Sequence, residues 1–349
     1  MIAVDSGLAP VGPCPLPAEG QTELRDLPAP AKLNLFLHVT GRRSDGYHLL
    51  QTVFTFVTLH DTVHLRRRED GLVQRVSALD GVPSDACLTV RAARALQVAT
   101  GCAFGVDITL DKRVPAGGGL GGGSSDAATV LLGLNRLWGT GLSREALMAL
   151  ALPLGADVPV FVGGTAAFAE GVGERLQPLT LTPAWYVVVQ PHAHVPTAAV
   201  FGDPCLTRDS SVVRIADFPT QHSLSPVDEN ADAGNRSKGI DPVALSRFGR
   251  NDLESVVFSR FSQVEQARQI MAQAVQRIGR QAGDVRMSGS GACLFVACDS
   301  QQQADTLKAE IAATIRASDE AAKAAPANAI QAVTVCAGID KHPLQHWAE

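Results

Sequence analysis

A glycine-rich segment constrains this chain more than any other feature of its sequence. Six of the seven positions from Gly117 to Gly123 are glycine. Glycine loses more backbone entropy on ordering than any other residue, so such a cluster is costly unless the backbone must adopt positive φ or lie against a ligand. We therefore expect a tight loop that another group approaches closely.

The residues after the glycines have the pattern of a helix. An apolar stripe with helical spacing is formed by Ala127, Leu131, Leu134 and Trp138. Ser124 and Ser125 precede this stripe and are candidate N-caps. The free N–H groups and positive dipole at a helix N-terminus attract anions, and glycines allow a polyphosphate to reach the backbone. The segment from 115 to 125 is therefore predicted to bind phosphate.

Other interpretations of the glycine segment fit less well. A flexible linker would mix Gly and Ser irregularly and would not lead directly into a helix. The G-x-x-x-x-G-K-[ST] loop needs a lysine after the glycines, where this chain has Ser124. A Rossmann fingerprint needs an acidic residue about 20 positions later in a parallel unit, which is not found here. A third kind of phosphate loop is indicated, with charge balanced by backbone dipoles, a divalent metal and a distant lysine.

Length and periodicity predict a two-domain α+β protein. A chain of 349 residues exceeds the size at which one core usually stops growing. Strand and helix patterns alternate without a regular β-α-β repeat. The expected parts are a disordered extension at 1–22, an N-terminal domain at 23–184, and a C-terminal domain at 185–349 with a surface insertion at about 207–239. The expected strands are 33–39, 52–59, 106–110, 185–190, 292–297 and 332–337, and the expected helices are 85–100, 143–154, 264–278 and 301–317.

Charge and cysteine usage exclude several classes of partner. The net charge is −5, and the basic cluster of Arg66, Arg67 and Arg68 is too short for a nucleic-acid surface. No apolar run approaches the roughly 20 residues of a membrane span. The seven cysteines are scattered and contain no C-x-x-C pair, which is typical of a reducing compartment. We expect a cytoplasmic monomer or weak homodimer that acts on a small molecule.

Residues 115–128 resemble the ATP-binding loop of the galactokinase, homoserine kinase, mevalonate kinase and phosphomevalonate kinase superfamily, the GHMP kinases. Four further segments resemble the branch that phosphorylates a cytidine diphosphate-linked methylerythritol: AKLNL at 31–35, DGYHLLQ at 45–51, GADVP at 155–159 and SGSGA at 288–292. The resemblance covers most of residues 28–340. It implies the two-domain GHMP architecture, an active site in the interdomain cleft, and transfer of a phosphoryl group from ATP, with Mg2+, to the 2-hydroxyl of the substrate.

This resemblance also implies roles for individual residues. The implied ATP-binding residues are Pro115, Ala116, Gly117, Gly118, Gly119, Leu120, Gly121, Gly122, Gly123, Ser124 and Ser125. Asp157 corresponds to the base that accepts the hydroxyl proton, although its turn would otherwise favour a purely structural side chain. Lys32 and Asn34 lie on one face of a strand by its two-residue period, and the resemblance makes Lys32 catalytic and Asn34 supporting.

Tyr47, His48, Phe201 and Thr197 are the implied substrate-binding residues. Tyr47 and Phe201 would stack on the cytosine and His48 would read its polar edge, with Thr197 close by. Residues 288–292 would lie near the phosphates. Protein ligands of the metal are unknown, with Ser125 as a weak candidate.

Three alternatives and one departure qualify this interpretation. Cys87 stands where the family is expected to have Asn, which affects the nucleotide edge rather than the chemistry. The chain could be another GHMP kinase of the homoserine or mevalonate type, but the Tyr47–His48 pair favours a cytidine ligand. It could be a nucleotide-binding sensor without turnover, but Lys32 and Asp157 are both present. A purely structural protein would not explain the glycine loop.

Overall fold

The computed structural model describes residues 3–4, 13–16, 18, 20–79, 81–220, 239–279, 282–321 and 329–348. The rest of the predicted extension at 1–22, and residues 221–238 of the predicted insertion, lie outside the described residues.

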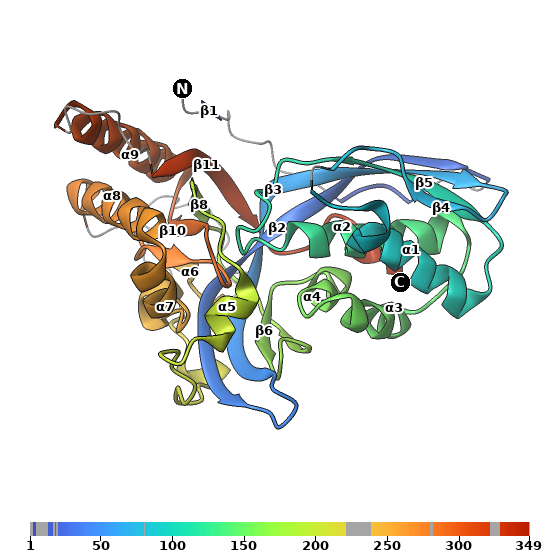
Figure 1. The fold of residues 1–349 in the computed structure, drawn as a ribbon, viewed down its shortest axis with the longest axis horizontal. Coiled ribbons are helices and arrows are strands. Elements are labelled where there is room, and N and C mark those ends of the chain that lie inside the picture. The colour runs from blue at the N-terminus through green and yellow to red at the C-terminus, as the bar shows by residue number, and fades with distance from the viewer. Residues whose placement is uncertain are drawn as a thin grey trace, which may run out of the picture.

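Two very long antiparallel strands connect the two halves of the molecule. Strand β2 (Glu23–Arg42) pairs with β3 (His48–Arg68), with Glu23 opposite Arg66 and Arg42 opposite His48. Figure 1 shows both strands running from the half that contains β5 to the half that contains α5. The predicted pairing of 33–39 with 52–59 is confirmed, but each strand is far longer than predicted, since the pairing continues through polar residues such as Glu23 and Arg66 outside the apolar runs.

The first half is a sheet with helices on one face. Strand β3 pairs with β5 (Gly105–Asp111) and β6 (Ala167–Glu170), while β4 (Val73–Arg75) extends the edge beside β5, and β7 (Arg175–Pro178) pairs with β6. The covering helices are α1 (Leu88–Thr100), α2 (Gly122–Leu137), α3 (Arg144–Ala151) and α4 (Val158–Gly163), with short 3-10 turns at Ser84–Ala86 and Leu152–Leu154 (Figure 1).

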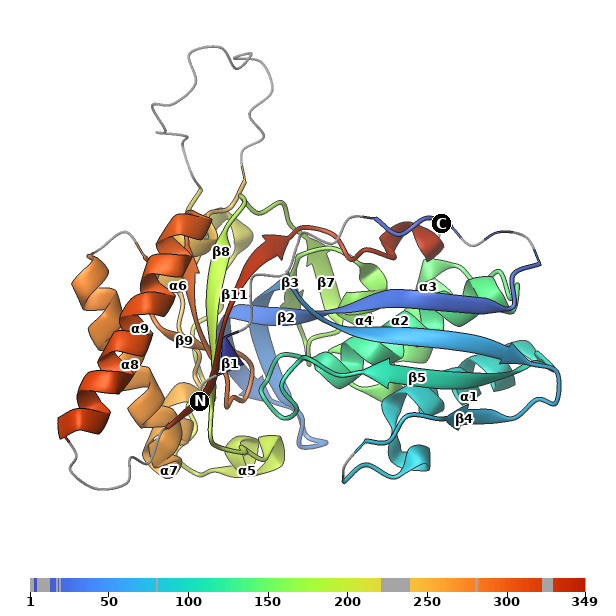
Figure 2. The same ribbon diagram turned by 90° about the horizontal axis from the view of Figure 1, so that it is seen from above.

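The second half is built around β8 (Trp185–Pro191). Strand β8 pairs with β10 (Leu294–Cys298) and β11 (Ile330–Ile339), and β10 also pairs with the short β9 (Arg286–Met287). Helices α8 (Ser262–Ile278) and α9 (Gln301–Ala321) lie side by side against this sheet (Figure 2). Smaller elements are α5 (Thr197–Gly202), α6 (Pro242–Phe248), α7 (Glu254–Arg260) and a 3-10 turn at Ile215–Asp217.

One sheet runs through both halves because β11 pairs with β8 on one side and with β3 on the other. The main strand order is β4-β5-β3-β11-β8-β10-β9. The α+β class predicted from the sequence is therefore confirmed.

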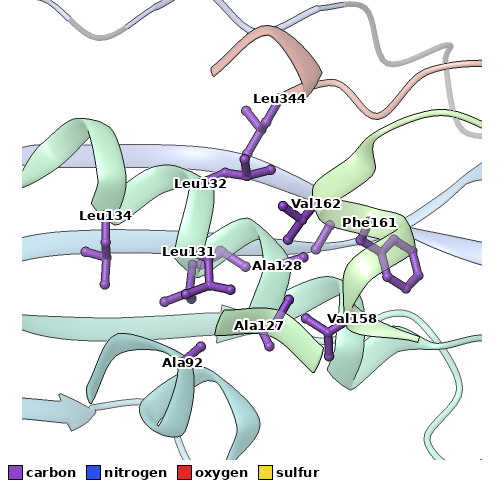
Figure 3. Close-up of a cluster of buried hydrophobic side chains, with 14 of the residues drawn as sticks. Ala92, Ala127, Ala128, Leu131, Leu132, Leu134, Val158, Phe161, Val162 and Leu344 are labelled. Carbon is purple, nitrogen blue, oxygen red and sulfur yellow. The ribbon is translucent and has the colours of Figure 1, made fainter. Parts of the chain in front are cut away.

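Helix α2 is the centre of the core of the first half. The predicted stripe residues Ala127, Leu131 and Leu134 are fully buried, and Leu132 on another side of the helix is fully buried too. Figure 3 shows these side chains among residues from α1, α4 and the C-terminal segment, including Ala92, Phe161 and Leu344. Such complete burial explains why the segment is more apolar than a surface helix needs to be.

The two cores exchange chain segments. Leu344 and Trp347, the latter in a 3-10 turn at Gln345–Ala348, pack into the core of the first half. Leu37 and Val39 of β2 pack into the core of the second. A single domain boundary at 184/185, as predicted, would assign each of these segments to the half whose core it does not join.

Parts of the predicted N-terminal extension make contacts that a disordered segment would not make. Strand β1 (Ala3–Val4) runs parallel to β11. The backbone N–H of Cys14 donates to the carbonyl of Pro343 at 3.0 Å, and the indole N–H of Trp347 donates to the carbonyl of Cys14 at 3.2 Å. These residues therefore help to hold the C-terminal segment in place. Within the described ranges, no helix has the length and apolar character needed to cross a membrane.

Candidate active site

A cavity of about 740 Å³ lies where segments of both halves meet. Its walls come from the glycine loop, the β2–β3 hairpin, the turn at Asp157, α5 and residues 289–291. The structure thus has a cavity at the place between the two halves where the sequence predicted the active site. The volume is within the range of ligand pockets.

The glycine loop forms one wall of the cavity. Gly117, Gly119, Gly121 and Ser124 line it. The other predicted ATP-binding residues do not: Pro115, Ala116, Gly118, Leu120, Gly122, Gly123 and Ser125. Every second residue from Gly117 to Gly121 therefore faces the cavity, followed by Ser124, and three of these four residues have no side chain.

The start of α2 differs from the prediction. The N-cap is Gly121, with φ of 71°, and the helix begins at Gly122. Ser124 and Ser125 thus lie inside the first turns, and neither caps the helix. Ser125 is fully buried and its hydroxyl has no hydrogen-bond partner among the residues that the structure describes, so its candidacy as a metal ligand stays a prediction. A helix starting at glycine leaves its first N–H groups accessible to an anion.

Packing against a second segment is a further reason for the glycines. A Cβ at Gly119 would lie 2.0 Å from the carbonyl oxygen of Ser288, and one at Gly118 would lie 2.5 Å from Sγ of Cys293. The hydroxyl of Ser288 donates to the carbonyl of Gly119 at 2.9 Å, and the N–H of Cys293 donates to the carbonyl of Gly118 at 3.1 Å. We expected the glycines to serve positive φ or the approach of a ligand, and part of their density serves this packing contact within the chain as well.

A buried ionic cluster lies beneath the loop. The ammonium of Lys112 contacts the carboxylates of Asp61 and Asp126, the latter at 2.5 Å. Asp61 also accepts from the backbone N–H groups of Arg113 and Val114 at 2.6 and 2.8 Å. Burial raises the pKa of Asp126 to about 7, although Lys112 acts in the opposite direction. The cluster ties the residues before the loop to the helix after it.

Lys32, Asn34 and Asp157 meet beside the loop. The ammonium of Lys32 is 3.3 Å from a carboxylate oxygen of Asp157 and donates to Oδ1 of Asn34 at 2.5 Å. Lys32 is 2% exposed, while the side chain of Asp157 is 35% exposed. The structure brings together the three side chains that the sequence analysis selected. Their arrangement places a carboxylate that can accept a proton beside a fixed positive charge.

The orientation of Asn34 is fixed by its neighbours. Its Nδ2 donates to the hydroxyl of Thr52 at 2.9 Å, and that hydroxyl donates to the carbonyl of Phe36 at 2.5 Å. Its Oδ1 therefore faces Lys32. Thr52 lines the cavity and was missed from the sequence because it resembles any other residue of a β-strand.

Asp157 does not have the structural role that its turn suggests. It occupies the N-cap position of α4, but its side chain makes no capping hydrogen bond. Its carboxylate lines the cavity instead. Ser124 faces the same turn, since a Cβ at Gly155 would lie 3.9 Å from the Ser124 hydroxyl.

The predicted substrate residues line the same cavity. Tyr47, His48, Thr197 and Phe201 all contribute to its wall. Phe201 contacts the ring of His48, with ring centroids 5.0 Å apart and planes tilted by 35°. Tyr47 is 65% exposed at the rim. The hydroxyl of Thr197 is 2.7 Å from that of Ser290, which joins α5 to the segment at 288–292.

Residues 207–220 are not the simple surface loop that the sequence predicted. Arg208 donates from Nε to Nε2 of His48 at 3.0 Å. Ser210 is buried and its hydroxyl donates to Asp252 at 2.5 Å. The N–H of Val213 donates to the side chain of Gln51 at 2.8 Å. Some polar side chains of this segment, such as Ser210, are used in buried contacts, which composition alone does not distinguish from solvent exposure.

No group of three or more His, Cys, Asp or Glu side chains suited to a metal is found among the residues that the structure describes. The seven cysteines are all free thiols.

Comparisons with known proteins place the chain in a family. The GHMP kinases N terminal domain matches residues 88–165, and GHMP kinases C terminal matches residues 243–317. The 4-diphosphocytidyl-2-C-methyl-D-erythritol kinase of Bordetella parapertussis is 52% identical over 324 residues, which is 93% of this chain and 98% of that protein. The protein of the same name from Cupriavidus metallidurans is 52% identical over 282 residues, 81% of this chain and 87% of that protein.

Solved structures agree with the sequence relatives. A crystal structure of 4-(cytidine 5'-diphospho)-2C-methyl-D-erythritol kinase is 33% identical, with a TM-score of 0.63 over 90% of this chain and 98% of that one. Homoserine kinase from Cytophaga hutchinsonii has a TM-score of 0.62 at 17% identity, covering 93% of this chain and 97% of that one, which shows a shared fold alone. The chain therefore belongs to the 4-diphosphocytidyl-2-C-methyl-D-erythritol kinase family of the GHMP kinases.

Proposed function

We propose that the chain transfers the γ-phosphoryl group of ATP to the 2-hydroxyl of 4-diphosphocytidyl-2-C-methyl-D-erythritol. The products are the 2-phosphate and ADP, in the methylerythritol phosphate route to isoprenoids. The observation that carries the proposal is a relative with the same activity in its name that is 52% identical along 98% of its length. The cavity adds physical support, because residues of the glycine loop and the aromatic side chains of Tyr47 and Phe201 all line it.

In this proposal the glycine loop holds the phosphates of ATP. The start of α2 and the loop N–H groups supply positive partial charges there. The 2-hydroxyl oxygen attacks the γ-phosphorus, the bond from that phosphorus to the β,γ-bridging oxygen breaks, and ADP leaves. The hydroxyl proton passes to the carboxylate of Asp157, which lines the cavity beside Lys32.

Lys32 would stabilise the negative charge that the reaction brings to this point. Its ammonium is buried and held by Asn34 and Asp157, so it needs little reorganisation when the charge develops. Preorganised charge in a site shielded from water is a large source of rate enhancement.

The residues present fit a Mg2+ ion that is held mainly by ATP. The hydroxyl of Ser124 and the carboxylate of Asp157 line the cavity on the side of the glycine loop. Kinase sites commonly hold Mg2+ with one or two protein ligands together with substrate phosphates, so a dedicated cage of carboxylates is not needed. When bound, the ion neutralises charge on the β- and γ-phosphates.

The cytidine would occupy the end formed by Tyr47, His48, Thr197 and Phe201. A flat base can stack on an aromatic ring while a polar side chain reads its edge. This end also argues against homoserine or mevalonate as substrate, because those alcohols have no base to place there. The Lys32–Asp157 pair beside the loop argues against a sensor without turnover.

The remaining expectations concern the cellular setting. Seven free thiols support a reducing compartment, and we propose the cytoplasm. Arg66, Arg67 and Arg68 are paired with Asp107, Glu69 and Asp70, which supports the absence of a nucleic-acid surface there. We also propose that the chain acts as a monomer or weak homodimer.

The test is ADP release by purified protein with ATP and Mg2+. 4-Diphosphocytidyl-2-C-methyl-D-erythritol, homoserine and mevalonate are supplied in parallel. We expect ADP with the cytidyl substrate alone. Turnover of homoserine or mevalonate would show that the chain is a kinase but that the aromatic residues do not select a cytidine substrate. ATP binding without turnover of any of the three alcohols would favour a nucleotide-binding sensor.

A further inference from the structure

We propose that Arg208 is a positioning residue that assembles the base-binding end of the cavity by holding His48 and α5 in one arrangement. The proposal rests on the proposed function, since it assumes that this end receives the cytidine. Arg208 lies in the segment for which the sequence predicted a surface insertion.

The guanidinium of Arg208 bonds both sides of the pocket. Its Nε donates to Nε2 of His48 at 3.0 Å, across 160 positions of sequence. Its Nη2 donates to the carbonyls of Phe201 and Asp203 at 3.0 and 2.7 Å, and its Nη1 donates to the carbonyl of Leu206 at 3.0 Å. A single side chain therefore joins the first residue of β3 to the C-terminal end of α5.

The contact with Arg208 determines which nitrogen of His48 carries the proton. A guanidinium has five N–H donors and no acceptor, and it does not lose its charge in proteins. Nε2 of His48 must therefore accept, and the neutral ring carries its proton on Nδ1. Arg208 thus makes Nδ1 the hydrogen-bond donor of this ring.

The charges around His48 favour the same neutral form. Burial lowers the pKa of His48, and the positive charges of Arg208 and Arg42 lower it further. Protonation of the ring would replace the acceptor at Nε2 by a donor facing the guanidinium, and the hydrogen bond would be lost. The Nδ1-protonated ring is therefore the state that the pocket maintains near neutral pH.

Arg208 acts through its partners rather than on a ligand. His48 and Phe201 line the cavity, while Arg208 is not among the residues that do. The ring contact between His48 and Phe201 depends on both being held, and both are bonded to this one guanidinium. The expected effect is on recognition of the base, with the phosphate end of the cavity unchanged.

The kinetic test compares Arg208→Ala and Arg208→Lys with wild type. Removing hydrogen bonds from a charged donor should raise KM for the cytidyl substrate about ten-fold or more, while KM for ATP and kcat stay within about two-fold. Arg208→Lys retains the charge but lacks the planar fork, so its KM should rise as well. Arg214→Ala is the matched control, because Arg214 lies in the same segment, is 82% exposed and pairs with Asp217.

A second measurement needs no substrate. The 15N shifts of the His48 ring, assigned with His48→Ala, report which nitrogen is protonated. We expect the Nδ1-protonated form in wild type and in Arg214→Ala, and a mixture of tautomers in Arg208→Ala. A general loss of stability would not change this ratio, so the ring signal separates positioning from a merely structural role.

The outcomes are distinct. A wild-type KM for the cytidyl substrate in Arg208→Ala, or a ring that stays Nδ1-protonated without Arg208, overturns the proposal. If Arg208→Lys has the wild-type KM for the cytidyl substrate, the positive charge alone is sufficient and the planar guanidinium is not required. If wild type does not phosphorylate the cytidyl substrate at all, the proposed function fails, and the ring measurement alone then decides whether Arg208 positions His48.

Discussion

The side chains proposed to carry the chemistry come from distant parts of the sequence and meet at one point. Lys32 lies in β2, and Asp157 lies at the N-cap of α4, yet their charged atoms are 3.3 Å apart. Lys32 is buried and bonded to Asn34, whereas the carboxylate of Asp157 remains accessible from the cavity. The accessible member of the pair is the one that can take up a proton from a substrate.

Asp157→Asn should separate chemistry from binding. Asn keeps the size of the side chain but cannot act as the base, so kcat should fall by about 10² to 10⁴, the usual contribution of such a group. ATP affinity, measured by calorimetry, should change little. Asp305→Asn, an exposed position on α9, serves as the control. A kcat close to that of wild type would remove Asp157 from the mechanism.

At the scale of elements, the glycine loop depends on the segments around it. The loop is fixed from below by Lys112, Asp61 and Asp126, and from the side by residues 288–293. Its shape is therefore set before ATP arrives, which reduces the entropy cost of binding.

Lys112→Met should destabilise the protein. It leaves Asp61 and Asp126 buried without their cation. We expect a loss of about 2 to 4 kcal/mol in the free energy of unfolding, somewhat below the usual cost of breaking a fully buried pair because Lys112 is partly exposed. Urea unfolding measures the change, with the exposed Lys341→Met as control. Equal stability of Lys112→Met and wild type would show that the cluster does not support the loop.

Gly119→Ala should damage the loop itself. The added methyl would lie 2.0 Å from the carbonyl of Ser288, at a position where φ is 73°. The loop or the 288–292 segment must move, so KM for ATP should rise by about ten-fold or more. Gly163→Ala, whose Cβ would meet Leu176 at an ordinary 3.7 Å, is the control. An unchanged KM for ATP in Gly119→Ala would contradict the close packing described here.

Local patterns predicted the elements well, and long-range contacts account for what they missed. The helix after the glycines, the strand pair and the Lys32–Asn34 face all follow from spacing within a few residues. The N-cap was wrong because Gly121 adopts a positive φ that serine avoids, so the helix begins before the serines. Arg208 was missed because its partner His48 is 160 positions away, and nothing near Arg208 in sequence signals that contact.

At the scale of the whole molecule, the C-terminal segment connects the two halves. After β11 the chain returns to the first half, where Leu344 and Trp347 complete its core. His342 is buried in this segment, and its Nδ1 accepts from the N–H of Leu344 at 3.1 Å. Burial lowers the pKa of His342 to about 3.

His342 should make the protein less stable in acid. An unfolded histidine binds a proton near pH 6.5, but the folded ring does so only near about 3, so stability is lost as pH falls between those values. The loss from this group should be about 2 kcal/mol between pH 7 and 5. Urea unfolding of His342→Asn should show a smaller loss over that range, since Asn can still accept from Leu344 but does not titrate.

Two other groups act in the opposite direction. Burial raises the pKa of Asp126 and Glu254 to about 7, so each favours the folded state as pH falls toward their unfolded values near 4. Both are present in wild type and variant and cancel in the difference. Parallel pH profiles for wild type and His342→Asn would contradict the assignment to His342.

We propose above that this cavity is where the 2-hydroxyl of 4-diphosphocytidyl-2-C-methyl-D-erythritol is phosphorylated. The most direct test is NMR of the product formed from substrate carrying 13C at carbon 2, with ATP and Mg2+. We expect a new phosphomonoester signal in the 31P spectrum that is coupled to the labelled carbon, and no such signal with Asp157→Asn over the same time. A phosphate on any other oxygen, or ATP turnover without a coupled product, would contradict it.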